Sequence, residues 1–170
     1  MDIISHGLYG WALFGTKNKK QFRLATGFGV LPDLLAFGLP SAIAIIALIS
    51  GNITTLGAPW HTQPAYVYAI YNVTHSLITW AVVFWVLRLI YKKPVKASFA
   101  RLLHILIDIP THSLAFFATP FLWPISSYRF NGIHRNSLII FIPNIIILAI
   151  IYTIYFRKKR RHHRKAITSL

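Results

Sequence analysis

The apolar stretch at residues 98–123 carries a carboxylate with an imidazole on either side. His104, Asp108 and His112 follow one another at intervals of four residues. An α-helix turns by about 100° per residue, so a step of four residues rotates the side chain by only about 40°. The three side chains are therefore expected on one face of a helix, over about two turns. Pro110 lies inside this pattern and is expected to tighten or break the helix before His112.

The other acidic residues of the chain also lie in apolar segments. There are three acids in all, each of them Asp, and Asp33 follows a proline at a point where its helix is expected to open. Asp2 precedes His6 by four residues, and His75 lies near the middle of a further apolar stretch. A charged Asp at the centre of a membrane helix costs roughly 2.5–3.5 kcal/mol, so such residues are functional candidates once a partner can be named.

Imidazole and carboxylate ligands together suit Zn²⁺ or another first-row divalent metal, and this set could hold one or two ions. With an open coordination position, such an ion lowers the pKa of a bound water to around 7 and makes it a nucleophile for esters or phosphoesters. A site at membrane depth favours a lipid-like substrate. Two alternatives stay open: a structural metal or polar network in a non-catalytic scaffold, and a relay that transports protons or metal ions.

The remaining histidines are expected outside the site. His61 falls in a loop, and His162 and His163 fall in a basic tail. His134 with Arg135 is either a loop pair or reaches back over the site. Three hydroxyl residues beside the candidates are expected to satisfy freed backbone groups or to support ligands rather than to act as nucleophiles: Ser76, Thr111 and Ser113.

Long apolar helices must position these residues. Of the 170 residues, 55% are hydrophobic and 12% are charged, against about 25% charged in soluble domains. Four stretches are long enough for a membrane-spanning helix of roughly 20 residues, at about 24–50, 65–91, 98–123 and 136–156. A short element at about 2–15 is expected to be a half-helix or an interfacial helix. The fold class predicted is an all-α, polytopic membrane helix bundle.

Prolines interrupt two of these stretches, and cysteine is absent. Pro32 and Pro40 lie in the first stretch, and Pro110, Pro120 and Pro124 lie in the third. Both helices are therefore expected to be kinked or broken. Without cysteine there is neither a disulfide nor a thiolate metal site.

Positive charge predicts the orientation. Sixteen of the 18 Lys and Arg residues flank the loops at 17–23 and 92–101 or lie in the tail, and only two lie in the connections at 51–64 and 124–135. This asymmetry makes the two basic loops and the C-terminus cytoplasmic. The expected organisation is a single membrane helical domain at 1–156 and a basic cytoplasmic tail at 157–170.

The net charge of +15 does not by itself indicate nucleic acid. The Lys and Arg residues collect in short clusters between apolar runs, as expected of loops near anionic lipid. The expected partners are therefore membrane lipid and, for the tail, anionic headgroups, and no nucleic-acid partner is expected.

Five short motifs together resemble the bacterial inner-membrane metal-dependent hydrolases, some of which are described as LexA-binding. They occur in the family's order over about residues 1–125. The motifs are MDIISHG at 1–7, LPD at 31–33, THS at 74–76, HILID at 104–108 and LWP at 122–124.

The resemblance implies a metal-dependent hydrolase of the inner membrane, with five metal ligands: His6, Asp33, His75, His104 and Asp108. Many members carry an apolar or small residue with Gly where this chain has Pro-Thr-His-Ser at 110–113. His112 is therefore an additional ligand or a general base. The H-x-x-x-D motif is also similar to one in zinc-dependent phospholipase C enzymes, which favours a phosphoester substrate.

Overall fold

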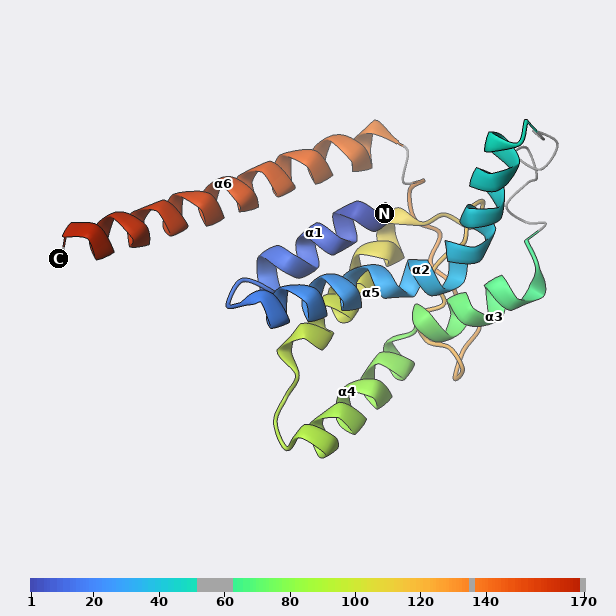
Figure 1. Cartoon of the computed structure of the whole chain (residues 1–170). Coiled ribbons are helices and arrows are strands. Elements are labelled where there is room, and N and C mark those ends of the chain that lie inside the picture. The colour runs from blue at the N-terminus through green and yellow to red at the C-terminus, as the bar shows by residue number, and fades with distance from the viewer. Residues whose placement is uncertain (52–62, 135–136, 169–170) are drawn as a thin grey trace.

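The computed structural model describes residues 1–51, 63–134 and 137–168, with side chains up to residue 161. His61 and the side chains of His162 and His163 lie outside this part. The described chain is helical and contains no strand. The elements in order are α1 (Ile3–Phe14), α2 (Lys19–Ile49), α3 (Ala65–Thr74), α4 (Leu77–Tyr91), the 3₁₀ turn η3 (Lys96–Ser98), α5 (Phe99–Thr111) and α6 (Leu138–Thr168) (Figure 1).

Two helices are long and apolar enough to cross a membrane, namely α2 and the Leu138–Arg161 part of α6. Helices α3 and α4 together pass the same test as one span that is bent by 59°. The described residues therefore hold two candidate spans, or three if the bent pair is one crossing. The prediction of an all-helical membrane protein is consistent with this arrangement, but four spanning helices are not confirmed.

The helix expected over residues 98–123 is shorter than predicted. Helix α5 has 13 residues and ends at Thr111, and residues 112–134 contain no further helix. At 1.5 Å per residue, α5 is about 20 Å long, whereas a hydrocarbon core is about 30 Å thick. Pro110 lies at the end of α5, so the sequence signal for a break was correct and the length of the predicted helix was wrong.

Helix α2 continues through both of its prolines. Pro32 and Pro40 lie inside a helix of 31 residues, which bends between its first and second halves (Figure 1). Proline removes one backbone hydrogen bond and bends a helix without having to end it. The helix therefore does not end before Asp33, as was expected, and Asp33 stays on α2.

The chain breaks between α3 and α4 at His75 and Ser76, where neither Pro nor Gly predicts a break. His75 ends α3, and Ser76 begins α4 as its N-cap. The Ser76 hydroxyl accepts hydrogen bonds from the backbone N–H groups of Ile78 and Thr79, at 3.1 and 3.3 Å. Two donors exposed by the break are thus satisfied, as buried backbone in a membrane requires.

Arg101 of α5 donates hydrogen bonds to the backbone carbonyls on the α3 side of the break. Its Nε donates to the carbonyl of Thr74 at 3.1 Å, and its Nη2 donates to the carbonyl of Val73 at 2.9 Å and to the Thr79 hydroxyl at 2.8 Å. The guanidinium therefore holds α5 against the break and fixes the direction in which His75 points.

Arg101→Ala is expected to destabilise the contact between α5 and the α3–α4 break without preventing folding. A hydrogen bond from a charged group contributes roughly 1.5–3 kcal/mol, so we expect the thermal transition in detergent to fall by several degrees and metal retention to weaken. The control is Arg88→Ala on exposed α4, whose guanidinium lies 5.6 Å from the ring centre of Trp85. Equal shifts for both variants, measured by circular dichroism, would contradict this role for Arg101.

Helix α1 contacts α2, α5 and α6 (Figure 1), and glycines allow its close approach to α2. A Cβ atom at Gly29 would lie 2.6 Å from the backbone oxygen of His6, and one at Gly10 would lie 2.5 Å from that of Ala25. Both distances are far below van der Waals contact. Small residues let membrane helices pack backbone against backbone, and here they bring His6 into the protein interior.

Helix α6 is joined to α1 by buried polar side chains. Tyr9 donates to the Asn144 side-chain oxygen at 3.0 Å, and the Asn144 amide donates to the Ser5 hydroxyl at 2.9 Å. Ser5 in turn donates to Asp2 at 2.6 Å, and Asp2 is the N-cap of α1. Asp2, unlike the other two acids, therefore serves a helix end and the attachment of α6.

Candidate metal centre

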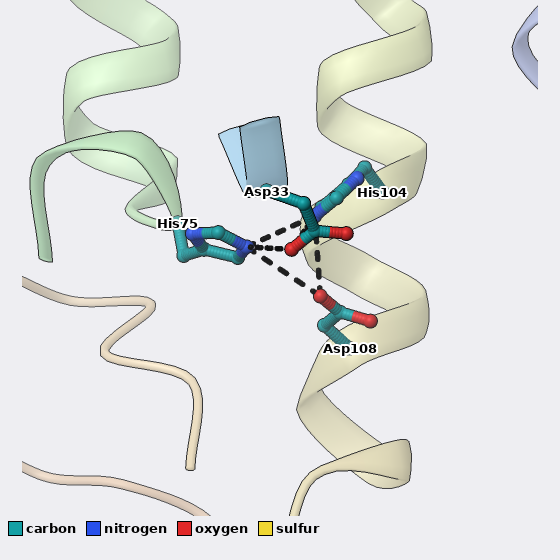
Figure 2. Close-up of side chains that lie close together, drawn as sticks. All are labelled: Asp33, His75, His104 and Asp108. Atoms are coloured by element: carbon teal, nitrogen blue, oxygen red, sulfur yellow. Dashed lines mark hydrogen bonds and ion pairs between the residues drawn. The ribbon is translucent and has the colours of Figure 1, made fainter. Parts of the chain in front are cut away.

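Four of the five expected ligands converge in the interior. Asp33 comes from α2, His75 from the end of α3, and His104 and Asp108 from α5 (Figure 2). One ligand atom of each residue lies within 4.8 Å of the ligand atoms of the other three. We call these residues the four-residue group. Asp33 and Asp108 therefore face the same point.

The spacing inside the four-residue group is that of ligands around one ion. The Nε2 atoms of His75 and His104 lie 3.0 Å apart. His104 Nε2 lies 3.2 Å from an Asp108 oxygen and 3.8 Å from an Asp33 oxygen. His75 Nε2 lies 3.6 and 3.3 Å from the same two oxygens. Ligands about 2.0–2.1 Å from a tetrahedral zinc ion are separated from one another by about 3.3 Å, so these distances fit one metal ion.

The hydrogen bonds of the two imidazoles indicate which nitrogen is free to bind. His104 Nδ1 lies 2.7 Å from the carbonyl oxygen of Gly29. His75 Nδ1 lies 2.9 Å from the Thr74 hydroxyl, which itself donates to the carbonyl of Ile70, and 3.3 Å from the carbonyl oxygen of Tyr71. A carbonyl only accepts, and the Thr74 hydroxyl has already donated its proton, so we assign the proton to Nδ1 in both rings. Both Nε2 atoms then carry lone pairs that face each other at 3.0 Å. A cation between them removes this repulsion, and Nδ1–H donation to a backbone carbonyl is typical of metal-binding histidines.

Burial adds to the need for a cation. His75, His104 and Asp108 are at most 1% exposed, and the side chain of Asp33 is 14% exposed. One buried oxygen of Asp108, Oδ2, has no hydrogen-bond partner among the described residues. A divalent ion would compensate both carboxylates and use this oxygen. The donor set of two imidazoles and two carboxylates fits Zn²⁺ and other first-row divalent ions.

His6 lies on the opposite side of Asp108. Its Nε2 is 2.9 Å from Asp108 Oδ1, the oxygen that faces away from the four-residue group, and its ring stacks on that of His104 at 3.6 Å between centroids. The amino group of Met1 contacts the same oxygen at 2.5 Å. His6 is therefore brought to the site but lies outside the four-residue group. In this position it holds Asp108 and His104 in place.

His112 also lies close to Asp108 Oδ1, although His112 follows the end of α5. It is the C-cap of α5 and has an extended backbone. Its Nδ1 nevertheless lies 3.3 Å from Asp108 Oδ1, and its ring stacks on that of Phe116. The imidazole is 4% exposed and borders a cavity that also reaches Asp33. His112 thus lies between the four-residue group and the space open to a substrate.

The hydroxyl residues act largely as expected. Ser76 caps α4, and its hydroxyl also donates to the carbonyl of Trp123. Thr111 donates to the carbonyl of Ile107 at 2.9 Å and accepts from the Met1 amino group at 3.1 Å. The hydroxyl of Ser113 is buried without a hydrogen-bond partner among the described residues. Ser76 and Thr111 therefore satisfy backbone groups beside the ligands.

Sequence reasoning missed three residues that orient the ligands. Gly29 accepts the Nδ1–H of His104, Arg101 holds the break at His75, and the buried Tyr71 ring stacks on His75 at 3.8 Å. Arg101 was interpreted only as part of a cytoplasmic charge cluster. The one sequence signal for Tyr71 is its position four residues before His75, on the same helix face.

Comparisons with protein-family models, with curated proteins and with solved structures found no match to this chain. The resemblance to the inner-membrane hydrolases therefore stays a prediction.

Proposed function

We propose that this protein is a metal-dependent hydrolase of the membrane that acts on a lipid-like ester or phosphoester. The observation that supports it most directly is the four-residue group, whose ligand atoms all lie within 4.8 Å of one another and whose two imidazoles lie 3.0–3.8 Å from each other and from the two carboxylates. The group is buried among apolar helices, and its most exposed member, Asp33, borders a cavity. A substrate that already lies in the membrane can reach such a site.

Each residue has a role in this proposal. A bound divalent ion lowers the pKa of its water to about 7. Asp33, His75, His104 and Asp108 would hold the ion. The Nδ1 of His112 lies 3.3 Å from Asp108 Oδ1 without a hydrogen bond between them, and in this proposal the imidazole takes a proton from the attacking water. His6, on the same oxygen of Asp108, keeps the carboxylate in place.

The proposed location is a bacterial-type inner membrane, with the loops at 17–23 and 92–101 and the C-terminal tail in the cytoplasm. With α2, the bent α3–α4 pair and α6 as three crossings, this orientation requires a fourth crossing between α4 and α6. Helix α5 and the irregular chain after it would make this crossing. Irregular backbone at membrane depth is tolerated where protein surrounds it, and residues 117–120 are buried.

The tail is proposed to lie on anionic headgroups. It carries seven Lys and Arg residues between 157 and 165. Each such charge near an anionic leaflet contributes about 1 kcal/mol of attraction. This role is independent of the metal centre.

A structural metal in a non-catalytic scaffold is the second candidate. One observation favours it: the four-residue group supplies four protein ligands, which is the number that a closed, structural zinc site uses. Catalysis requires a further coordination position, as in five- or six-coordinate ions. Absorption spectra of the cobalt-loaded protein separate the two candidates. A spectrum that changes when inorganic phosphate is added indicates an open position, whereas an unchanged tetrahedral spectrum indicates a structural ion.

His112→Gln tests the catalytic role directly. We expect it to retain metal and to lower hydrolysis of alkyl esters or phosphoesters by about 10²–10⁴-fold, the usual contribution of a general base. The assay compares the detergent-purified protein before and after chelation and after reloading with Zn²⁺ or Mn²⁺. Turnover that survives chelation, or that is unchanged in His112→Gln with full metal content, would contradict the proposed mechanism.

A further inference from the structure

A cavity of about 770 Å³ lies beside the four-residue group. Asp33 and His112 border it at one end, and the second half of α2 and the first turns of α6 form its sides. Its volume is within the range of roughly 300–1,000 Å³ that is typical of small-molecule sites. The cavity is therefore continuous with the candidate metal centre and large enough for a ligand.

Small residues open the cavity along α2. Gly38, Ser41 and Ala42 border it, and Ile45 borders it one turn further along. Spacings of three and four residues place these positions on one face of the helix. From Asp33 to Ile45 the helix rises about 18 Å, which is comparable to the length of a long acyl chain. The small side chains thus leave a space that runs away from the metal ligands along the helix.

The opposite walls are apolar. Phe37 and Phe116 border the cavity, as do Ile140 and Phe141 of α6. The polar lining residues Asp2, Asp33, His112 and Asn144 lie toward one end, where Asn144 is joined through Ser5 to Asp2, and Ser41 adds one hydroxyl along α2. An apolar space with one polar end matches an amphiphile and does not match a wholly polar substrate.

We infer that this cavity binds a single hydrocarbon chain of an amphiphilic ester or phosphoester. The headgroup lies at Asp33 and His112, and the chain runs along α2 toward Ile45. Gly38 and Ala42 determine the longest chain that fits. The inference rests on the proposed function only in placing the reacting headgroup at the metal ligands, because chain binding itself requires no turnover.

The test uses hexadecyl phosphate with a photoreactive diazirine at the chain end, added to the full-length protein in detergent. Cross-linked residues are mapped by mass spectrometry. We expect labels on α2 around Ser41 and Ile45 and on the first turns of α6. Unlabelled hexadecyl phosphate should compete for them. Labels spread evenly over the exposed apolar faces of α2, α4 and α6 would overturn the inference. They would show that hexadecyl phosphate coats the apolar surface as a detergent does and has no specific site.

Gly38→Leu should block the cavity. A Cβ atom at Gly38 meets only the flexible Leu34 side chain, at 3.4 Å or more, so the helix tolerates the change. We expect hexadecyl labelling to fall about tenfold, as for the loss of a few buried methylene groups. Gly27→Leu is the control on the same helix, because its Cβ meets nothing within 4 Å. Ala42→Phe is a second variant that fills the cavity. Unchanged metal content in Gly38→Leu and Ala42→Phe would show that both variants are folded.

The outcomes separate this inference from the proposed hydrolase. Site-directed labelling that Gly38→Leu and Ala42→Phe abolish supports the chain-binding cavity, even if no substrate is hydrolysed. Hydrolysis of butyl and hexadecyl phosphoesters at equal rates by the wild type, with no cavity labelling, would overturn the cavity while leaving the hydrolase in place. Equal labelling of Gly38→Leu, Ala42→Phe and the wild type would also overturn the inference that the cavity binds the chain.

Discussion

Asp108→Asn is expected to empty the metal centre. Asp108 presents Oδ2 to the Nε2 atoms of His75 and His104, at 3.6 and 3.2 Å, and is completely buried. Asparagine keeps the shape but removes the charge, and a neutral amide is a far weaker ligand than a carboxylate. Changes to residues that merely support ligands already lower metal affinity by about 10–100-fold, so loss of a ligand should be at least as severe.

The measurement is the metal content of the detergent-purified protein by mass spectrometry, with and without added zinc. We expect near-stoichiometric metal in the wild type and less than about a tenth of that in Asp108→Asn. Asp2→Asn is the matched control, because it makes the same chemical change at the acid that serves as the N-cap of α1, where Asn is an equally good cap. Equal metal content in the wild type and both variants would show that the four-residue group is not the site.

Gly29→Ala is expected to destabilise the whole helix assembly. On propensity alone, Ala in a helix stabilises by about 0.5–1 kcal/mol relative to Gly. At Gly29, however, the added Cβ would lie 2.6 Å from the backbone oxygen of His6. Backbone atoms cannot rotate away as a flexible side chain can, so α1 and α2 must separate. Overpacking of this kind typically costs about 1–3 kcal/mol or more.

The consequence should extend to the metal centre. The Gly29 carbonyl holds His104 Nδ1 at 2.7 Å, and His6 contacts Asp108 at 2.9 Å, so a separation of α1 from α2 moves both contacts. We expect a lower thermal transition by circular dichroism and reduced metal content. Gly27→Ala, two residues away in open space, should leave the transition unchanged or raise it slightly. A Gly29→Ala transition equal to that of Gly27→Ala would contradict the close contact.

The sequence by itself determined the class of protein and the pairing within α5. Long apolar runs and a low charged fraction predict membrane helices because the length of a span follows from bilayer thickness. His104 and Asp108 meet because helical periodicity is local: residues four apart face the same side whatever surrounds them. The structure confirms this pairing, with the two side chains 3.2 Å apart.

Only the tertiary structure decided where the helices break. Pro32 predicted a break in its helix, yet α2 continues through it. The break occurs instead at His75, which has neither Pro nor Gly beside it, because Arg101 from α5 supplies hydrogen bonds to the freed carbonyls of Val73 and Thr74. A donor 26 residues or more away along the chain compensates the lost helical bonds, and no local pattern around His75 contains that information.

The tertiary structure also decided how the ligands are divided. Sequence reasoning placed His6 and His75 together as equivalent ligands, but they reach opposite oxygens of Asp108. His6 approaches from one side because glycines let α1 pack closely on α2, and His75 approaches from the other because it is the C-cap residue just after the end of α3. Periodicity predicts which residues share a face of one helix, whereas the side from which a second helix approaches depends on packing between segments distant in the sequence.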